Sequence, residues 1–344
     1  MIHPIDAYVG MTKFFMNLDL PCKGSVPRPK GFKVIELSTP LPGPYYVYSL
    51  LKENLDTFHA VGILKKRFGG KWKWLGLKDS NAITLQLVSS SKFVEPWSFR
   101  HGKRCLVLRP LGLGKINKDS LSGNLFVIDI ELECETSAFS GRFVVPGYFS
   151  YQRFGTTRPV SHVVGKLVLR RDWEEAIDVL LGEPTPWESR RARELRLKYY
   201  EEGPKAFLKA PRFLDVEREV AKKLLKGESP ERALRSLNVF KVFLHAYQAY
   251  LYNKALSTFE DPCEGPRRLP GPGAREYEDL LWEEGVDYRA FEEFGLRAEP
   301  RQPCAETEIK AFAKGRTLTL VFALPRGYYA TTILRELIKN PFNL

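Results

Sequence analysis

The stretch GLKDSNAITLQ, residues 76–86, places one carboxylate, Asp79, in a turn between two patterned segments. Before it, residues 54–68 repeat apolar side chains at three- and four-residue steps and end in basic residues, which predicts a helix. After it, residues 83–88 alternate apolar and polar side chains, the period of a strand with one buried face. Asp79 is therefore expected just ahead of a strand, although Asp, Ser and Asn also occupy turns for conformational reasons alone.

The length and composition indicate a globular protein. With 344 residues, 44% of them hydrophobic, the chain can form two domains or one domain with an insertion. No run approaches the roughly 18 apolar residues of a membrane helix, and the start MIHPIDAYVG lacks the basic and apolar regions of a signal peptide. We therefore expect a cytoplasmic protein with no membrane partner.

The formal net charge is +12, which indicates a polyanionic partner because Lys and Arg neutralise phosphates and release bound counterions. Nucleic acid is the first candidate. A basic thermophile protein without such a partner is the alternative, since 24 prolines and many Arg and Glu residues also fit that class.

The cysteines and histidines suggest no cross-link and no metal site. The five histidines are scattered, and the odd number of cysteines contains no C-x-x-C pair, so we expect free thiols and no protein-built metal site. The cysteines are Cys22, Cys105, Cys134, Cys263 and Cys304.

The predicted secondary structure changes from strands to helices near Arg170. Before it, period-two segments predict strands, and after it apolar spacing and capping residues predict helices. Beyond a Pro- and Gly-rich loop at 261–273, strand and then helix patterns return. A β-rich body interrupted by a helical block suggests an inserted domain. The expected strands are 32–37, 105–108, 124–133 and 318–324, and the expected helices are 172–181, 185–200, 215–226, 229–237, 241–257 and 330–339.

A second motif, PGYFSYQRFGTTRPVSHVVGK at 146–166, interleaves aromatic and cationic side chains. Aromatic faces stack on unpaired bases while Arg and Lys hold phosphates, so the mixture suits single-stranded or flipped-out nucleotides. A core strand with inward aromatics is the alternative reading. The candidates are Tyr148, Phe149, Tyr151, Arg153 and Phe154.

Together these segments resemble the TruD-type family of tRNA pseudouridine synthases, in its archaeal and eukaryotic branch. The resemblance lies in GLKDSNAITLQ (76–86), GYFSYQRFGTTRPVSHVVGK (147–166), HAYQAYLYNKALS (245–257) and GYYATTILRE (327–336), with YSLLKENLDT (48–57) as a weaker match.

The resemblance implies an α+β pseudouridine synthase fold, with a mixed, largely antiparallel sheet and an inserted family-specific α/β domain. The catalytic domain would comprise residues 1–158 and 302–344, and the insertion residues 159–301. The helix at 245–257 packs with either part in this scheme. Oligomeric state is not predicted.

The resemblance also implies an activity: isomerisation of a tRNA uridine to pseudouridine without cofactor or metal. The position is thirteen as in the family, or thirty-five as known in this branch. The family's catalytic aspartate matches Asp79, which would act on a flipped-out nucleotide. The implied substrate-binding residues are Phe32, Phe149, Tyr148, Arg153, Tyr329 and Lys78, of which Phe32 and Tyr329 also fit ordinary core aromatics.

This sequence departs from the family where a cation is expected to pair with the catalytic carboxylate. The basic residue six positions before Phe32 is Val26, and Arg28, Lys23 or Lys78 would have to replace it. Gly147 also stands where the family has Asn, and Lys30-Gly31 replaces its Glu-Asp. An RNA-binding or chaperone homologue with weak or lost catalysis is therefore the alternative function.

Overall fold

The computed structural model describes residues 2–155 and 157–344, which form two compact units. The sheet unit comprises residues 16–145 and 305–344, and the helical unit comprises the chain up to Phe15 and residues 146–304. The predicted domain boundaries were 158/159 and 301/302, whereas the two compact units divide at 15/16, 145/146 and 304/305, with the first residues in the helical unit. Met1 and Thr156 of the predicted catalytic domain lie outside the described residues.

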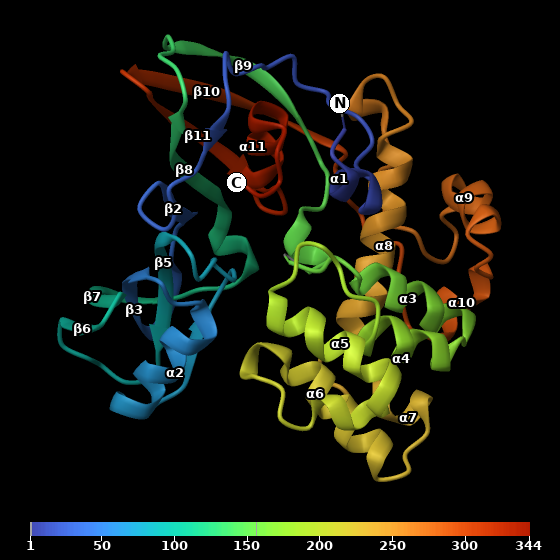
Figure 1. The fold of residues 1–344 in the computed structure, drawn as a ribbon. Helices are drawn as coiled ribbons and strands as arrows, with labels where there is room; N and C mark the ends of the chain where they lie inside the picture. Colours follow the sequence, from blue (N-terminus) through green and yellow to red (C-terminus); the bar gives the residue numbers. More distant parts are fainter. Residues whose placement is uncertain (1, 156) are drawn as a thin grey trace. The chain divides into compact units, whose positions relative to one another are not determined.

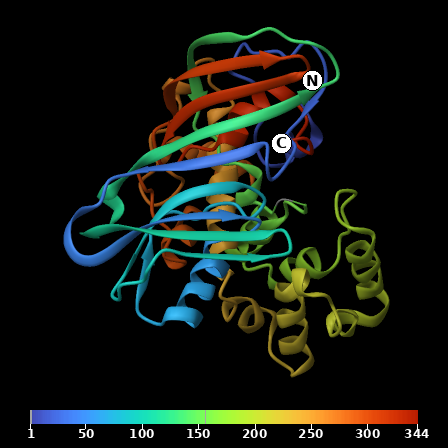
Figure 2. The ribbon, with the colours of Figure 1, turned by 90° about the vertical axis from the view of Figure 1, so that its left-hand side faces the viewer.

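The sheet unit is built on one mixed sheet with the order β6-β7-β3-β5-β2-β8-β11-β10-β9 (Figures 1 and 2). Strands β2 and β5 pair in parallel, whereas the pairs β2–β8, β3–β5 and β8–β11 are antiparallel, which confirms a mixed, largely antiparallel sheet. The strands are β1 Gly24–Ser25, β2 Phe32–Ser38, β3 Leu41–Glu53, β4 Trp72–Trp74, β5 Ile83–Ser90, β6 Trp97–His101, β7 Arg104–Lys115, β8 Leu121–Leu132, β9 Phe139–Pro146, β10 Cys304–Lys314 and β11 Thr317–Pro325.

Two helices bury the apolar faces of this sheet. Helix α2 (Thr57–Phe68) packs through Val61 and Leu64 on side chains of β3, β5 and β7. Helix α11 (Ala330–Ile338) packs through Ile333 and Leu334 on β8, β10 and β11, where Figure 1 shows it against the strands. The predicted helix at 54–68 begins three residues later, because the Asp56 carboxylate caps it by accepting from the His59 amide at 2.9 Å.

The described part of the helical unit consists of helices, short turns and one isolated β-bridge between Arg268 and Pro300. Its helices are α1 Pro4–Tyr8, α3 Ser161–Arg170, α4 Trp173–Leu181, α5 Arg190–Glu202, α6 Asp215–Leu225, α7 Pro230–Arg235, α8 Phe240–Leu256, α9 Glu278–Glu283 and α10 Tyr288–Glu293. The core-strand reading of 146–166 is wrong about the strand, because a 3-10 turn at Tyr151–Arg153 and the start of α3 lie there, but it is right that the aromatic side chains pack inward: Tyr148, Phe149, Tyr151 and Phe154 are all buried. None of the helices described, in either unit, is long and apolar enough to cross a membrane.

Helices α3 and α8 form the centre of the helical unit by close backbone approach. A Cβ on Gly165 would lie 2.1 Å from the carbonyl oxygen of Phe243, so this crossing requires glycine. Helix α8 is buried on most sides, which places it with the helical unit rather than with the sheet.

The prediction of five free thiols is wrong for four of them. Disulfides join Cys22 to Cys134 and Cys263 to Cys304, while Cys105 carries a free thiol. The first pair follows from strand register: Gly24 faces Leu132 in the β1–β8 pair, so the residues two steps beyond each also meet.

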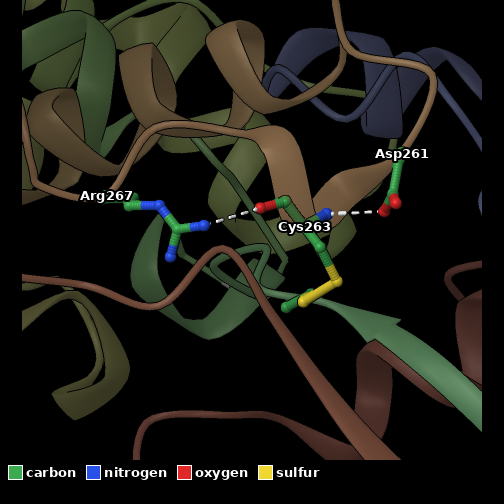
Figure 3. Close-up of a disulfide and its surroundings, with 4 residues drawn as sticks. Asp261, Cys263 and Arg267 are labelled. Carbon is green, nitrogen blue, oxygen red and sulfur yellow. Dashed lines mark hydrogen bonds between the residues drawn. A yellow bond between two sulfur atoms is a disulfide. The ribbon is translucent and has the colours of Figure 1, made fainter.

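The second disulfide fastens the Pro- and Gly-rich loop to the start of β10 (Figure 3). The loop is further held at Cys263, whose amide donates to the Asp261 carboxylate at 2.8 Å and whose carbonyl accepts from Arg267 at 3.4 Å. The fold thus brings together cysteines that are far apart in the sequence, and rules based on cysteine spacing do not predict such pairs.

Candidate active site

Asp79 lies in the turn that leads from β4 into β5, as the sequence pattern predicted. Its side chain is 29% exposed, so solvent and a ligand can reach it. The neighbouring Lys78 amide donates to Thr57 Oγ1 at 3.0 Å, which ties the turn to the first residue of α2. The turn therefore presents one accessible carboxylate on a fixed backbone.

The cation beside this carboxylate is Arg28. Its Nη1 lies 3.8 Å from Asp79 Oδ2, and only 15% of its side chain is exposed. The guanidinium is itself held, because Nε donates to the Leu344 carbonyl at 2.9 Å and Nη1 to the Asn81 carbonyl at 3.1 Å. Burial lowers the pKa of Arg28, and the negative charge of Asp79 opposes that shift.

The position where the sequence comparison expected a cation is apolar core. Val26 is 8% exposed and packs in the cluster beneath the sheet. Of the three substitutes considered, Arg28 takes the place beside Asp79. Lys23 is exposed at the surface, and Lys78 has a different partner.

The aromatic ring of Phe32 packs against the Arg28 guanidinium. The Arg28 Cζ lies 3.8 Å from the centre of the Phe32 ring, a cation–π contact. The ring is 3% exposed and meets Phe126 edge to face, with centroids 6.3 Å apart. In this structure Phe32 thus fixes the guanidinium, and its predicted contact with substrate stays a prediction.

Lys78 forms a buried ion pair with Glu36 of β2. The Lys78 Nζ lies 2.8 Å from Glu36 Oε2 as a charge contact without hydrogen-bond alignment, with side chains 6% and 0% exposed. The other Glu36 oxygen accepts from Ser38 Oγ at 3.0 Å and from the Leu87 amide at 3.2 Å. The ion pair directs Lys78 into the unit, so the geometry favours a role in holding the turn over its predicted role in binding substrate.

In the helical unit, Phe149 is the centre of a cation–π cluster. The guanidinium carbon of Arg301 lies 3.9 Å from its ring centre, and that of Arg153 lies at 5.3 Å. Its main chain is clamped by Asn253 of α8, which accepts from the Phe149 amide at 2.8 Å and donates to its carbonyl at 3.0 Å. Tyr252 meets the ring edge to face. The predicted pair Phe149 and Arg153 therefore does lie together.

Sequence reasoning missed Arg301, which also donates to the Gly147 carbonyl at 3.1 Å. It lies in an aperiodic, Pro-flanked segment that carries no pattern to find it by. Position 147 favours glycine for a steric reason, because a Cβ there would lie 2.8 Å from the carbonyl oxygens of Gln302 and Pro303. The departure from Asn at this position thus fits the local backbone.

The two predicted tyrosines have different surroundings. Tyr148 is fully buried in the helical unit, where its hydroxyl shares a hydrogen bond of 2.8 Å with Ser257 Oγ. Tyr329 is half-buried at the start of α11 in the sheet unit. Asp79, Phe32, Lys78 and Tyr329 belong to the sheet unit, whereas Tyr148, Phe149 and Arg153 belong to the helical unit.

A cavity of about 900 Å³ in the sheet unit shares Arg28 with the Asp79 site. Cations exceed carboxylates in its lining, and one of the cations, Lys33, is paired with Asp129 at 2.8 Å. The excess of positive charge suits a phosphate backbone. The charged lining residues are Arg28, Lys30, Lys33, Arg100, Lys103, Glu53, Asp129 and Glu131.

No group of three or more metal-ligating side chains gathers within the described ranges 2–155 and 157–344.

Comparison with known proteins places this geometry in context. A sequence profile described as "tRNA pseudouridine synthase D (TruD)" matches residues 11–262. A protein from Sulfurisphaera tokodaii named "Probable tRNA pseudouridine synthase D" is 33% identical, with 96% of this chain and 98% of the relative covered. A protein of the same name from Methanopyrus kandleri is also 33% identical, with 86% of each chain covered. A crystal structure of a TruD protein from Methanosarcina mazei has a TM-score of 0.72 at 22% identity, covers 100% of both chains, and shows a shared fold.

Proposed function

The chain belongs to the tRNA pseudouridine synthase D family, and we propose that it converts a specific tRNA uridine to pseudouridine with Asp79 as its catalytic carboxylate. The observation that carries the assignment of Asp79 is its position: a partly exposed carboxylate, 3.8 Å from the Arg28 guanidinium, in a turn held by its neighbours. A cation at this distance attracts the carboxylate and limits its motion.

The reaction is an isomerisation, so no atoms are added or removed. The bond between N1 of the base and C1′ of the ribose breaks, the base rotates, and a bond between C5 and C1′ forms. The proton on C5 then leaves, and N1 gains one. Positive charge develops at C1′ when the glycosidic bond breaks, and the Asp79 carboxylate either attacks C1′ as the nucleophile or, in a glycal route, stabilises that charge and acts as a base.

The nucleotide has to leave its stack for Asp79 to reach C1′, which costs about a few kcal/mol of unstacking. Phosphate contacts with the basic cavity and aromatic stacking offset this cost. For this role the residues expected from the sequence remain proposals, each within its own unit: Arg153 and Tyr329 are partly exposed, whereas Phe32, Tyr148 and Phe149 are buried and would stack on a base only after their packing opens. We propose position thirteen of tRNA as the target, with position thirty-five as the second candidate.

Mapping of pseudouridine tests the proposal. The purified protein is incubated with unmodified tRNA, and pseudouridine is located by carbodiimide labelling and primer extension. We expect one modified position with the wild type, none with Asp79→Ala, and full modification with Asp119→Ala, which removes an exposed aspartate of the same unit. Empty maps for all three proteins across a complete tRNA pool would refute the enzyme assignment.

The alternative, an RNA-binding homologue without catalysis, rests on the departures at Val26, at Lys30-Gly31 and at Gly147. It predicts tRNA binding that falls steeply with salt, is unchanged in Asp79→Ala, and yields no pseudouridine. The position of Arg28 beside Asp79 favours the enzyme, because it supplies the cation that Val26 does not.

A further inference from the structure

Beneath the Asp79 turn lies a set of buried polar side chains that the chemistry does not use directly. We call Glu36, Lys52, Thr57 and Gln86 the turn anchor. They come from β2, β3, α2 and β5, and none of them is more than 8% exposed. Four elements of the sheet unit thus contribute a polar group to one turn.

Lys52 makes the most direct connection. Its ammonium donates to the carbonyl oxygens of Leu55 at 2.7 Å, Lys78 at 3.2 Å and Asp79 at 2.9 Å. An ammonium has three donors, so these three bonds satisfy it completely. Two of the three acceptors belong to the catalytic turn, and one of them is the carbonyl of Asp79 itself.

The other members hold the rest of the turn. Thr57 Oγ1 accepts from the Lys78 amide at 3.0 Å and donates to Gln86 Oε1 at 3.0 Å. The Gln86 amide nitrogen in turn donates to the Gly76 carbonyl at 3.4 Å. Glu36 fixes the Lys78 side chain. The backbone from Gly76 to Asp79 lies outside any strand, so these side chains supply hydrogen bonds that a sheet ladder would otherwise supply.

Lys52 is an unfavourable choice for stability alone. The side chain is completely buried, and its hydrogen-bond acceptors are neutral carbonyls rather than a carboxylate. Burying a charge without a paired charge costs free energy, and apolar residues of similar volume are often better tolerated. Burial lowers the pKa of Lys52 to about 8, an effect that Asp79 and Asp56 oppose and Lys78 reinforces.

We propose that Lys52 is a positioning residue, which fixes the main chain of Asp79 so that its carboxylate meets the ribose of the flipped uridine. The inference rests on the proposed function of Asp79. Misplacement of a reacting group by about 1 Å reduces rates by on the order of a hundredfold, so a loosened turn affects the chemical step far more than the binding of tRNA.

The test uses Lys52→Met, which keeps an unbranched side chain one atom shorter and removes the charge and the donors. We measure the single-turnover rate of pseudouridine formation and the tRNA dissociation constant, and we follow amide hydrogen exchange of the segment 76–82 in the free protein. The expected result is a rate about 30-fold to 100-fold lower, a dissociation constant within about twofold of wild type, and faster exchange confined to the turn.

Arg196→Met is the matched control. It removes a buried cation from the helical unit, where Arg196 pairs with Glu188 and Glu217, and thus lowers stability without touching the turn. At a temperature where both variants are folded, it should keep the wild-type rate and the wild-type exchange at 76–82.

Three results would overturn the proposal: unchanged exchange at 76–82 in Lys52→Met, an unchanged rate in that variant, or an equal loss of rate in Arg196→Met. The exchange measurement needs no turnover, so it decides whether Lys52 holds the turn even if the wild type forms no pseudouridine. In that event the proposed function fails, and the positioning role in this reaction fails with it.

Discussion

Replacing Arg28 by glutamine removes the cation beside the proposed catalytic carboxylate. At the observed separation of 3.8 Å, two unit charges interact by about 4 kcal/mol with an effective dielectric constant of about 20. The Asp79 side chain is 29% exposed, so solvent screening reduces this, and we take a net loss of about 2 kcal/mol. A loss of that size in the chemical step corresponds to a rate about 30-fold lower.

The assay is single-turnover release of tritium from tRNA that carries tritiated C5 of uridine, because C5 loses its proton in the reaction. Lys23→Gln is the matched control, since it removes the same formal charge from an exposed residue five positions away that does not line the basic cavity. It should leave the single-turnover rate within about twofold of wild type. Arg28→Lys keeps the charge but loses the planar fork that bonds the Leu344 and Asn81 carbonyls, so we expect an intermediate rate.

Two results would refute this reasoning about Arg28. A wild-type rate in Arg28→Gln would show that the carboxylate needs no cation at this position. Equal losses in Arg28→Gln and Lys23→Gln would show that general attraction of tRNA, rather than the local ion pair, sets the rate. Thermal unfolding of each variant establishes that the proteins are folded at the assay temperature.

Three further predictions concern stability. Burial lowers the pKa of His162 from 6.5 to about 4, so between these pH values the unfolded chain binds a proton that the folded chain does not. The free energy of unfolding measured in urea should therefore fall by up to about 3 kcal/mol as the pH drops from 6.5 to 4. His162→Phe should remove this dependence. The Cys263–Cys304 disulfide joins residues 41 positions apart, so Cys263→Ser should lower the free energy of unfolding by about 4 kcal/mol. Thiol titration of the denatured wild type should give one thiol before reduction and five after it. Arg196→Met should cost about 3 to 5 kcal/mol in chemical denaturation, because it removes the cation paired with Glu217 and one of the two cations paired with Glu188, and a loss below about 1 kcal/mol would contradict the buried network.

The local part of the site could be predicted from the sequence, because it depends on neighbours in the chain. The period change around residues 76–86 places Asp79 between a helix and a strand, and the structure has α2, β4 and β5 there. The predicted helix at 185–200 begins at Arg190 instead, since Ser189 accepts from the Ala192 amide at 3.3 Å and caps it. Capping side chains move the ends of elements more than they change their type.

The partners of the site could not be predicted in the same way, because they come from distant parts of the chain. Arg28 is fixed by the carbonyl of Leu344, 316 positions away, and Lys78 by Glu36 on a neighbouring strand. Lys52 and Lys78 are the same residue type, yet the ammonium of Lys52 donates to main-chain carbonyls and that of Lys78 forms an ion pair with a carboxylate. Residue type gives the available hydrogen bonds, but only tertiary packing decides which are made.

The departure at Val26 shows how the fold compensates for a changed residue. Val26 is buried among apolar side chains, where an ammonium would lose hydration without gaining a partner. Arg28 lies two residues further along the same segment, outside that cluster, and reaches Asp79 across the face of Phe32. The proposed reaction calls for a positive charge within ion-pair distance of the carboxylate, and the long side chain of Arg28 supplies it. Arg28, rather than residue 26, therefore supplies the cation in this chain, and a positive charge still lies beside Asp79.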